Sequence, residues 1–149
     1  MHLRWIIRVL CQLAGICLLS TMLSVPAAVG ATYYVDADVA SPGGGLSWAD
    51  AFNTLQDALD AAASGDEIWV AEGVYYPDEG AGQIDNSASS FFALASGVSI
   101  YGGFSGDEVV VADRDWRTNV TVLSGDIDRN DTVDANGVVT DAANISGTN

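Results

Sequence analysis

The sequence predicts an all-β solenoid, a parallel β-helix with an N-terminal capping α-helix. The main observation is an internal repeat of three octets that align without gaps and each end in glycine. They are DEIWVAEG (66–73), SGVSIYGG (96–103) and TNVTVLSG (118–125). Apolar residues fill the third and fifth positions of each octet, an alternation typical of a strand that buries one face. A period of roughly 20 to 30 residues is typical of a solenoid, and connections of that length favour parallel strands.

Stacked coils would place Ile68, Val98 and Val120 above one another in a single apolar column. The terminal glycines would then mark the same corner of successive coils. The alternative is three unrelated strands that happen to end in glycine.

The start of the chain predicts a secretory signal peptide. Two arginines come first, an apolar stretch follows over 9–25, and small residues precede a cleavage site after Ala31. A transmembrane anchor is the alternative, but the apolar stretch is short for a span of about 20 residues. We therefore expect a signal peptide at 1–31, a mature domain at 32–149, and a secreted, extracellular or cell-surface location.

The mature chain is strongly acidic and lacks several reactive side chains. Loss of the signal removes both cysteines and the only histidine, and the sequence has no lysine. Three arginines (Arg114, Arg117 and Arg129) then oppose all 20 acidic residues, which gives a formal charge of −17. This charge disfavours nucleic acid, whose phosphates need Lys and Arg, and anionic membrane surfaces. It is compatible with calcium, which takes oxygen ligands. Solubility alone is the alternative explanation.

The first elements of the mature chain are a strand and a helix. The β-branched and aromatic run Thr32–Val35 predicts a strand, and Pro42 with three glycines predicts a loop over 36–46. A helix is expected over 47–64, with Ser47 and Asp50 as a near capping box. Its apolar face consists of Phe52, Leu55, Leu59 and Ala62.

The remaining elements are strands and loops. Gly65 ends the helix, and the strand 68–71 follows directly. The polar, Gly-rich segment 75–90 is expected to be a long loop. The apolar runs 98–101 and 120–123 predict the second and third repeat strands.

Three stretches carry a resemblance to a known family. They are SWADAFNTLQDALDAAASGDEIWVAEGVYYP (47–77), SIYGGFSG (99–106) and RDWRTNVTVLSGDID (114–128). Together they resemble the N-terminal cap and first coils of secreted right-handed parallel β-helix proteins of the pectate-lyase-like superfamily. The resemblance implies the fold and export. It leaves activity open, because this fold carries polysaccharide lyases, glycoside hydrolases and adhesins. Such proteins usually have many more coils than the three or so expected here, so we expect an incomplete fragment of a longer protein.

A candidate calcium site lies near the C-terminus. Oxygen-bearing side chains alternate along the acidic segment 126–134, and the candidate ligands are Asp126, Asp128, Asn130 and Asp134. The pattern departs from an EF-hand loop, because Asp131 replaces the glycine and Gly137 replaces the bidentate glutamate. The alternative is a solvated acidic loop. Calcium is the one cofactor that the sequence suggests.

The residue types in the mature chain restrict catalysis. Without His, Cys or Lys there is no Ser-His-Asp triad, thiolate nucleophile, Schiff base or His/Cys zinc site. No residue is therefore assigned as catalytic or cofactor-binding. The predicted function is a noncatalytic scaffold or a module that contacts extracellular polysaccharide or another cell-surface component. The alternative is the N-terminal part of a polysaccharide lyase or glycoside hydrolase whose active site lies in further coils.

Aromatic side chains could stack on sugar rings if they are exposed. The candidates are Trp48, Trp69, Tyr75, Tyr76 and Tyr101. Trp69 and Tyr101 are out of phase with the Ile/Val positions of their octets, so we expect them to face outward.

Overall fold

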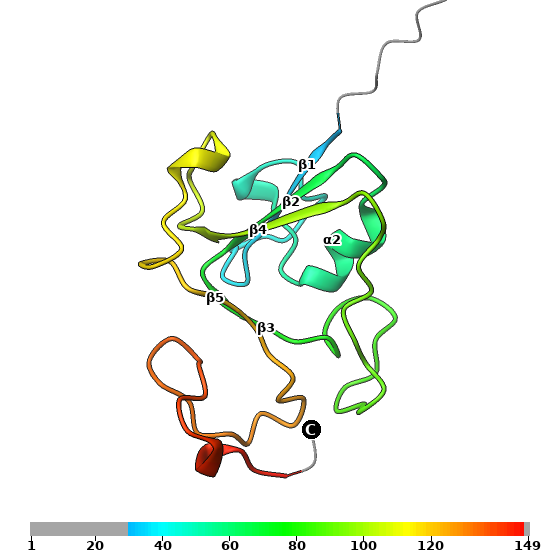
Figure 1. Cartoon of the computed structure of the whole chain (residues 1–149). Coiled ribbons are helices and arrows are strands. Elements are labelled where there is room, and N and C mark those ends of the chain that lie inside the picture. Colours follow the sequence, from blue (N-terminus) through cyan, green and yellow to red (C-terminus); the bar gives the residue numbers. More distant parts are fainter. Residues whose placement is uncertain (1–29, 148–149) are drawn as a thin grey trace, which may run out of the picture.

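The computed structural model of the chain describes residues 30–147 (Figure 1). Its strands are β1 (Thr32–Val35), β2 (Glu67–Ala71), β3 (Gly73–Tyr75), β4 (Ser99–Phe104) and β5 (Thr121–Leu123). Its helices are the α-helix α2 (Leu55–Ala61) and the 3-10 turns η1 (Trp48–Asp50), η2 (Val111–Asp113) and η3 (Ala142–Asn144). The predicted signal peptide lies outside the described residues except for Gly30 and Ala31.

The strands form two parallel sheets. Sheet A has the order β1-β2-β4, and sheet B consists of β3 and β5. The chain passes from sheet A to sheet B twice, from β2 to β3 and later from β4 to β5 (Figure 1). Parallel pairing agrees with the long connections, which leave room for the chain to return to the same end of the sheet.

The predicted column of Ile68, Val98 and Val120 is wrong in register. Ile68 lies opposite Ile100, two residues beyond Val98. The third repeat strand is in sheet B, where Val122 lies opposite Val74. The physical reason is that side chains alternate with a period of two, so a shift of two residues leaves the same residues on the buried face. The alternation in the sequence is therefore compatible with both registers.

The α-helix is shorter than predicted and begins later. Its N-cap is Thr54, whose hydroxyl oxygen accepts a hydrogen bond from Asp57 N at 3.3 Å and donates to the Asp57 carboxylate at 2.7 Å. The predicted cap Ser47 makes no capping hydrogen bond and instead precedes η1. Phe52 is extended, because its backbone pairs with β1 rather than with a helical turn.

Residues 45–52 cover the outer edge of β1. Tyr34 N donates to Gly45 O, Phe52 N donates to Tyr34 O, and Asp36 N donates to Phe52 O, at 2.8 to 2.9 Å. These bonds satisfy backbone groups that an edge strand would otherwise leave open to pairing with another chain. Ala31 extends the other side of β1, where its N donates to Asp66 Oδ1 and its O accepts from Glu67 N.

Sheet A buries both of its faces. One face carries Val35, Ile68 and Val70, which pack with Leu55 and Leu59 of α2 in the main core. The opposite face carries an aromatic cluster, described below. The helix side thus holds these aliphatic residues together with Tyr33, which packs against the core, whereas Tyr34 and Trp69 lie on the other side.

Candidate functional site

The aromatic cluster on sheet A is packed rather than available to a ligand. Trp69 is 6% exposed and stacks on Phe104, with ring centroids 4.9 Å apart and planes 7° apart. Tyr34 and Trp48 complete the cluster through edge and tilted contacts. The expectation that Trp69 faces outward is therefore wrong. The residue that covers the indole is Phe104, which directly follows the second octet and ends β4.

The other predicted stacking residues are also engaged by the protein. Tyr75 is buried and donates a hydrogen bond to Ala71 O at 3.2 Å, and burial raises the pKa of its hydroxyl well above its ordinary value. The guanidinium of Arg114 lies 5.3 Å from the ring centre of Tyr101. Trp48 donates its indole N–H to Glu108 O at 2.9 Å. These rings stabilise the fold.

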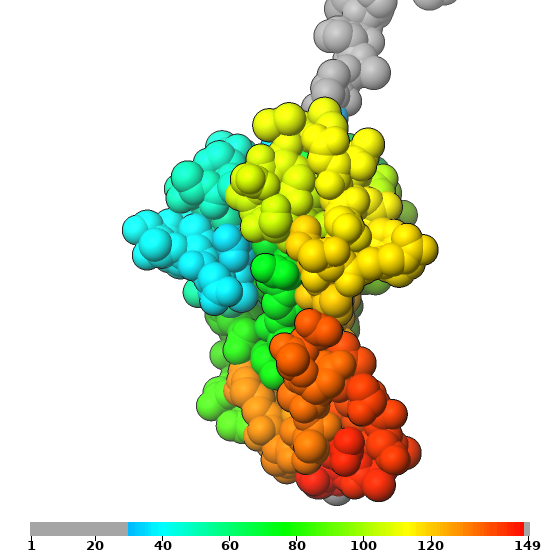
Figure 2. All heavy atoms as spheres, turned by 90° about the vertical axis from the view of Figure 1, so that its left-hand side faces the viewer, coloured from blue at the N-terminus to red at the C-terminus, as the bar shows by residue number. Residues whose placement is uncertain are grey.

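Two carboxylates hold the turns that lead from β4 to β5. Glu108 accepts hydrogen bonds from the backbone N–H groups of Ser105, Gly106 and Asp107. Partial burial raises the pKa of the Glu108 carboxyl, but these hydrogen bonds have the larger effect and lower the pKa overall. Asp115 accepts from the Thr118 hydroxyl and from backbone N–H groups, which lowers the pKa of its carboxyl. Asp115 N also donates to Gly103 O at the outer edge of β4. Figure 2 shows residues 105–118 gathered over this part of the surface.

The candidate calcium residues mostly cap their own turns. The buried carboxylate of Asp126 accepts from Asn130 N and Asp131 N, each at 3.1 Å. Asp128 accepts from the Asn130 side-chain amide at 2.6 Å, and Asp134 accepts from Asn136 and Val138 N. Within residues 30–147, no group of three or more His, Cys, Asp or Glu side chains is arranged to hold a metal ion. The calcium site therefore stays a prediction.

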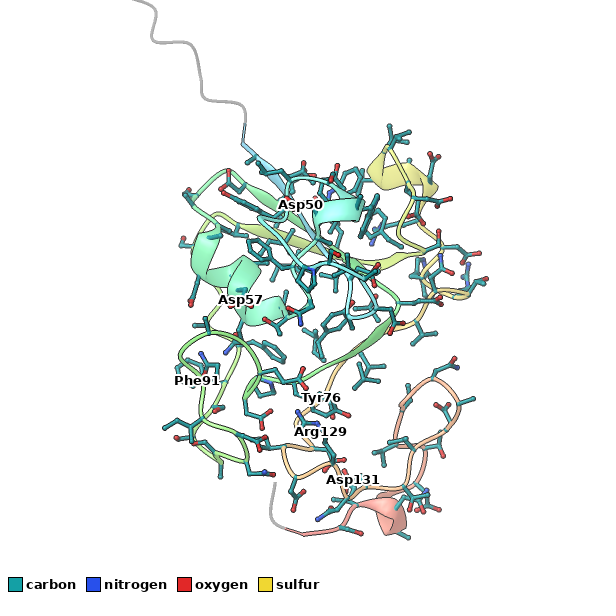
Figure 3. All side chains as sticks on the ribbon, turned by 180° about the vertical axis from the view of Figure 1, so that it is seen from behind. Asp50, Asp57, Tyr76, Phe91, Arg129 and Asp131 are labelled. Atoms are coloured by element: carbon teal, nitrogen blue, oxygen red, sulfur yellow. The ribbon has the colours of Figure 1, made fainter. Side chains whose placement is uncertain are left out.

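Arg129 is the centre of an ion-pair cluster that the sequence did not indicate. Its guanidinium lies 2.6 Å from Glu79 Oε1, 3.8 Å from Asp78 Oδ1 and 3.6 Å from Asp85 Oδ1. It also lies 4.4 Å from the ring centre of Tyr76. Figure 3 labels both residues and shows them next to each other. We name these five residues the Arg129 cluster. It joins the C-terminal segment 126–147 to the loop that follows β3.

Burial and charge shift the pKa values within the Arg129 cluster. Burial raises the pKa of the Tyr76 hydroxyl, and Arg129 only partly offsets this. Burial lowers the pKa of Arg129, but the hydrogen bond and charge of Glu79 outweigh it and raise the pKa overall. Asp78 is 4% exposed; its Oδ2 accepts from Asn86 N, and its Oδ1 has no hydrogen bond. The charge of Arg129 is therefore the main compensation for a buried carboxylate oxygen.

A groove of about 240 Å³ lies between α2 and the loop 82–93. The helix contributes Gln56 and Asp60, and the loop contributes serines, Gln83 and Phe91. Gln56 donates its amide to Pro77 O at 2.9 Å and to Phe91 O at 3.1 Å, which fixes the loop against the helix. Phe91, labelled in Figure 3, is nevertheless 69% exposed. The sequence predicts a long loop over 75–90, and no motif in it indicates a groove.

No protein-family model, curated protein or solved structure significantly matches the chain. In the part of the chain that the structure describes, none of the helices is long and apolar enough to cross a membrane.

Proposed function

We propose that the chain forms the N-terminal cap and first coils of an exported right-handed parallel β-helix that acts as a noncatalytic scaffold and contacts polysaccharide outside the cell. The observation that carries this proposal is the order of strand pairing. β2 and β4 pair in parallel in sheet A, and the strands that follow them, β3 and β5, pair in parallel in sheet B. A chain that visits the same two sheets in the same order on successive passes is what a β-helix requires.

The usual hand of parallel connections and the capped edge of β1 support the same proposal. Connections between parallel strands of one sheet are right-handed in nearly all proteins, about 98% of cases. The backbone of 45–52 closes the edge of β1, which is the function of a cap in a stacked fold. The acidic charge of the chain suits an extracellular protein that must remain dispersed.

Polysaccharide contact is tested with the purified chain without its signal peptide. We expect immobilised polysaccharide to retard the protein in affinity electrophoresis, with no release of reducing or unsaturated sugar ends. Panels of neutral and acidic polysaccharides, with and without calcium, cover the ligand classes considered. Retardation by none of them would defeat the contact function. Release of unsaturated or reducing ends would favour the alternative of a lyase or hydrolase.

Export has a separate test. Expression of the full chain in a secreting host should deliver the protein to the medium with Thr32 at its N-terminus. Cleavage there would remove the two hydrogen bonds that Ala31 makes with Asp66 and Glu67, so the mature strand β1 would be held by its remaining partners. Retention of the full-length chain in the cell would contradict export.

A further inference from the structure

We propose that the groove between α2 and the loop 82–93 binds a segment of a neutral polysaccharide. This inference rests on the proposed polysaccharide contact and names both its place and its ligand class. Nothing in the sequence repeat or in the resemblance points to this surface, which lies away from the strands. Its chemistry and its rigidity carry the argument.

The groove combines an exposed aromatic ring with closely placed polar groups. Phe91 lines the groove and is 69% exposed, so its ring can pack against the apolar C–H face of a sugar. Gln83, Ser87, Ser90 and Asp60 also line it and can exchange hydrogen bonds with sugar hydroxyls. Ligand sites commonly pair an apolar platform with a few polar groups that set orientation.

The walls of the groove are held in place before any ligand arrives. Gln56 is 5% exposed and donates to backbone carbonyls on both sides of the loop. Asp57 accepts from Ala81 N at 2.9 Å, and Ser90 N donates to Ser87 O at 2.9 Å. A preformed site loses less conformational entropy on binding than a flexible loop would.

Charge selects a neutral ligand over an acidic one. None of the residues that line the groove is basic, and one of them, Asp60, is a carboxylate. The acidic excess of the whole chain would further repel a polyuronate. Of the three arginines in residues 30–147, Arg129 is paired with carboxylates and Arg117 lies on Trp116. An uncharged chain of sugars meets none of this repulsion.

The test measures binding of soluble β-glucan, mannan, xylan and polygalacturonate by affinity electrophoresis and isothermal titration. We expect at least one neutral polysaccharide to bind and polygalacturonate to bind more weakly by on the order of tenfold or more. Phe91→Ala should weaken neutral binding on the order of tenfold, and Asp60→Ala should weaken it by a few fold. Leu94→Ala is the matched control, because Leu94 is 67% exposed on the same segment but does not line the groove.

Each failure has its own consequence. If a neutral polysaccharide binds but Phe91→Ala binds equally well, the groove is the wrong site while polysaccharide contact stands. Tighter binding of polygalacturonate would overturn the ligand class. If no polysaccharide binds, the contact function itself fails. A Phe91-dependent dimer in sedimentation velocity, without sugar binding, would assign the groove to a second copy of the chain and overturn the inference.

Discussion

Arg129 joins the C-terminal segment 126–147 to the loop that follows β3. It adopts the left-handed backbone conformation, with φ at 53°, at a position where glycine is usually favoured. Its guanidinium compensates the charge of the buried Asp78 and also contacts Glu79, Asp85 and Tyr76. The backbone conformation of Arg129 is therefore unfavourable for a residue with a side chain. We infer that the contacts of the guanidinium offset this cost.

We predict that Arg129→Ala lowers the free energy of unfolding by about 1–2 kcal/mol. The arginine side chain is partly exposed, which limits the value of its ion pairs, but its loss leaves a buried carboxylate without compensation. Limited proteolysis should then cut within 126–147 faster than in the wild type. Arg117→Ala is the control, since Arg117 contacts the exposed Trp116. Equal cleavage rates in the two variants would contradict the role of the Arg129 cluster.

We predict that ionisation of Tyr75 lowers the stability of the protein at alkaline pH. Burial raises the pKa of its hydroxyl in the folded state, whereas the unfolded chain has the ordinary value of about 10. The folded state therefore keeps a proton that the unfolded state releases. The stabilisation from the protonated Tyr75 hydroxyl is complete below about pH 10 and is lost as pH rises above this value. Denaturant unfolding should show the free energy of unfolding falling progressively as pH rises above about 10.

The Tyr75→Phe variant isolates that contribution. The variant loses the hydrogen bond to Ala71 O and should be less stable than the wild type at neutral pH. It cannot ionise at position 75, so its stability should fall less steeply above about pH 10 than that of the wild type. All other tyrosines remain in both proteins, and parallel pH profiles would therefore refute the assignment.

At the level of elements, the start of α2 separates two capping hypotheses. The structure assigns the cap to Thr54 and Asp57, whereas the sequence pattern predicted Ser47 and Asp50. Thr54→Ala should destabilise the protein by about 0.5–2 kcal/mol, the usual cost of losing an N-cap. Ser47→Ala should change stability by less than about 0.5 kcal/mol, as for most surface positions. Thermal unfolding followed by circular dichroism measures both, and the reverse order would favour the longer helix.

The sequence predicted the positions of the strands better than the way in which the strands pair. Strands were expected over 32–35, 68–71 and 98–101, close to β1, β2 and the first half of β4. Strand β3 was missed because it is short and begins with Gly73 at a φ of 140°. The register of each strand and the sheet to which it belongs depend on where the preceding connection brings the chain back. Side chains alternate with a period of two residues, so the alternation is the same in two registers that differ by two residues.

The groove and the Arg129 cluster were harder to predict from sequence. Both form between segments that lie far apart in the chain and carry no motif. Gln56 reaches Phe91, and Arg129 reaches Glu79, only after the strands have brought those loops together. The acidic segment 126–134 was visible in the sequence as a ligand pattern, but its hydrogen bonds show that Asp126 and Asp134 serve the local turns.

For the whole molecule, the order of strands in two separate sheets is the feature that decides the proposed fold. Glu67 in β2 lies opposite Ser99 in β4, whereas Val122 in β5 belongs to the other sheet. Adjacent strands lie about 4.8 Å apart, a spacing that suits a disulfide, whose Cα atoms are usually about 4.4–6.8 Å apart. Because the mature chain has no cysteine, two engineered cysteines can form an intramolecular disulfide only with each other.

We therefore predict that Glu67→Cys with Ser99→Cys forms an intramolecular disulfide under mild oxidation. The pair Glu67→Cys with Val122→Cys should not, since its members lie in different sheets. Val74→Cys with Val122→Cys, which are partners in sheet B, should also form a disulfide. Mass spectrometry of peptides before and after reduction identifies each bond. If Glu67→Cys formed a disulfide with Val122→Cys as readily as with Ser99→Cys, the two-sheet arrangement would be contradicted. The β-helix proposal would then fail as well, because it depends on the chain passing through the two sheets in the same order.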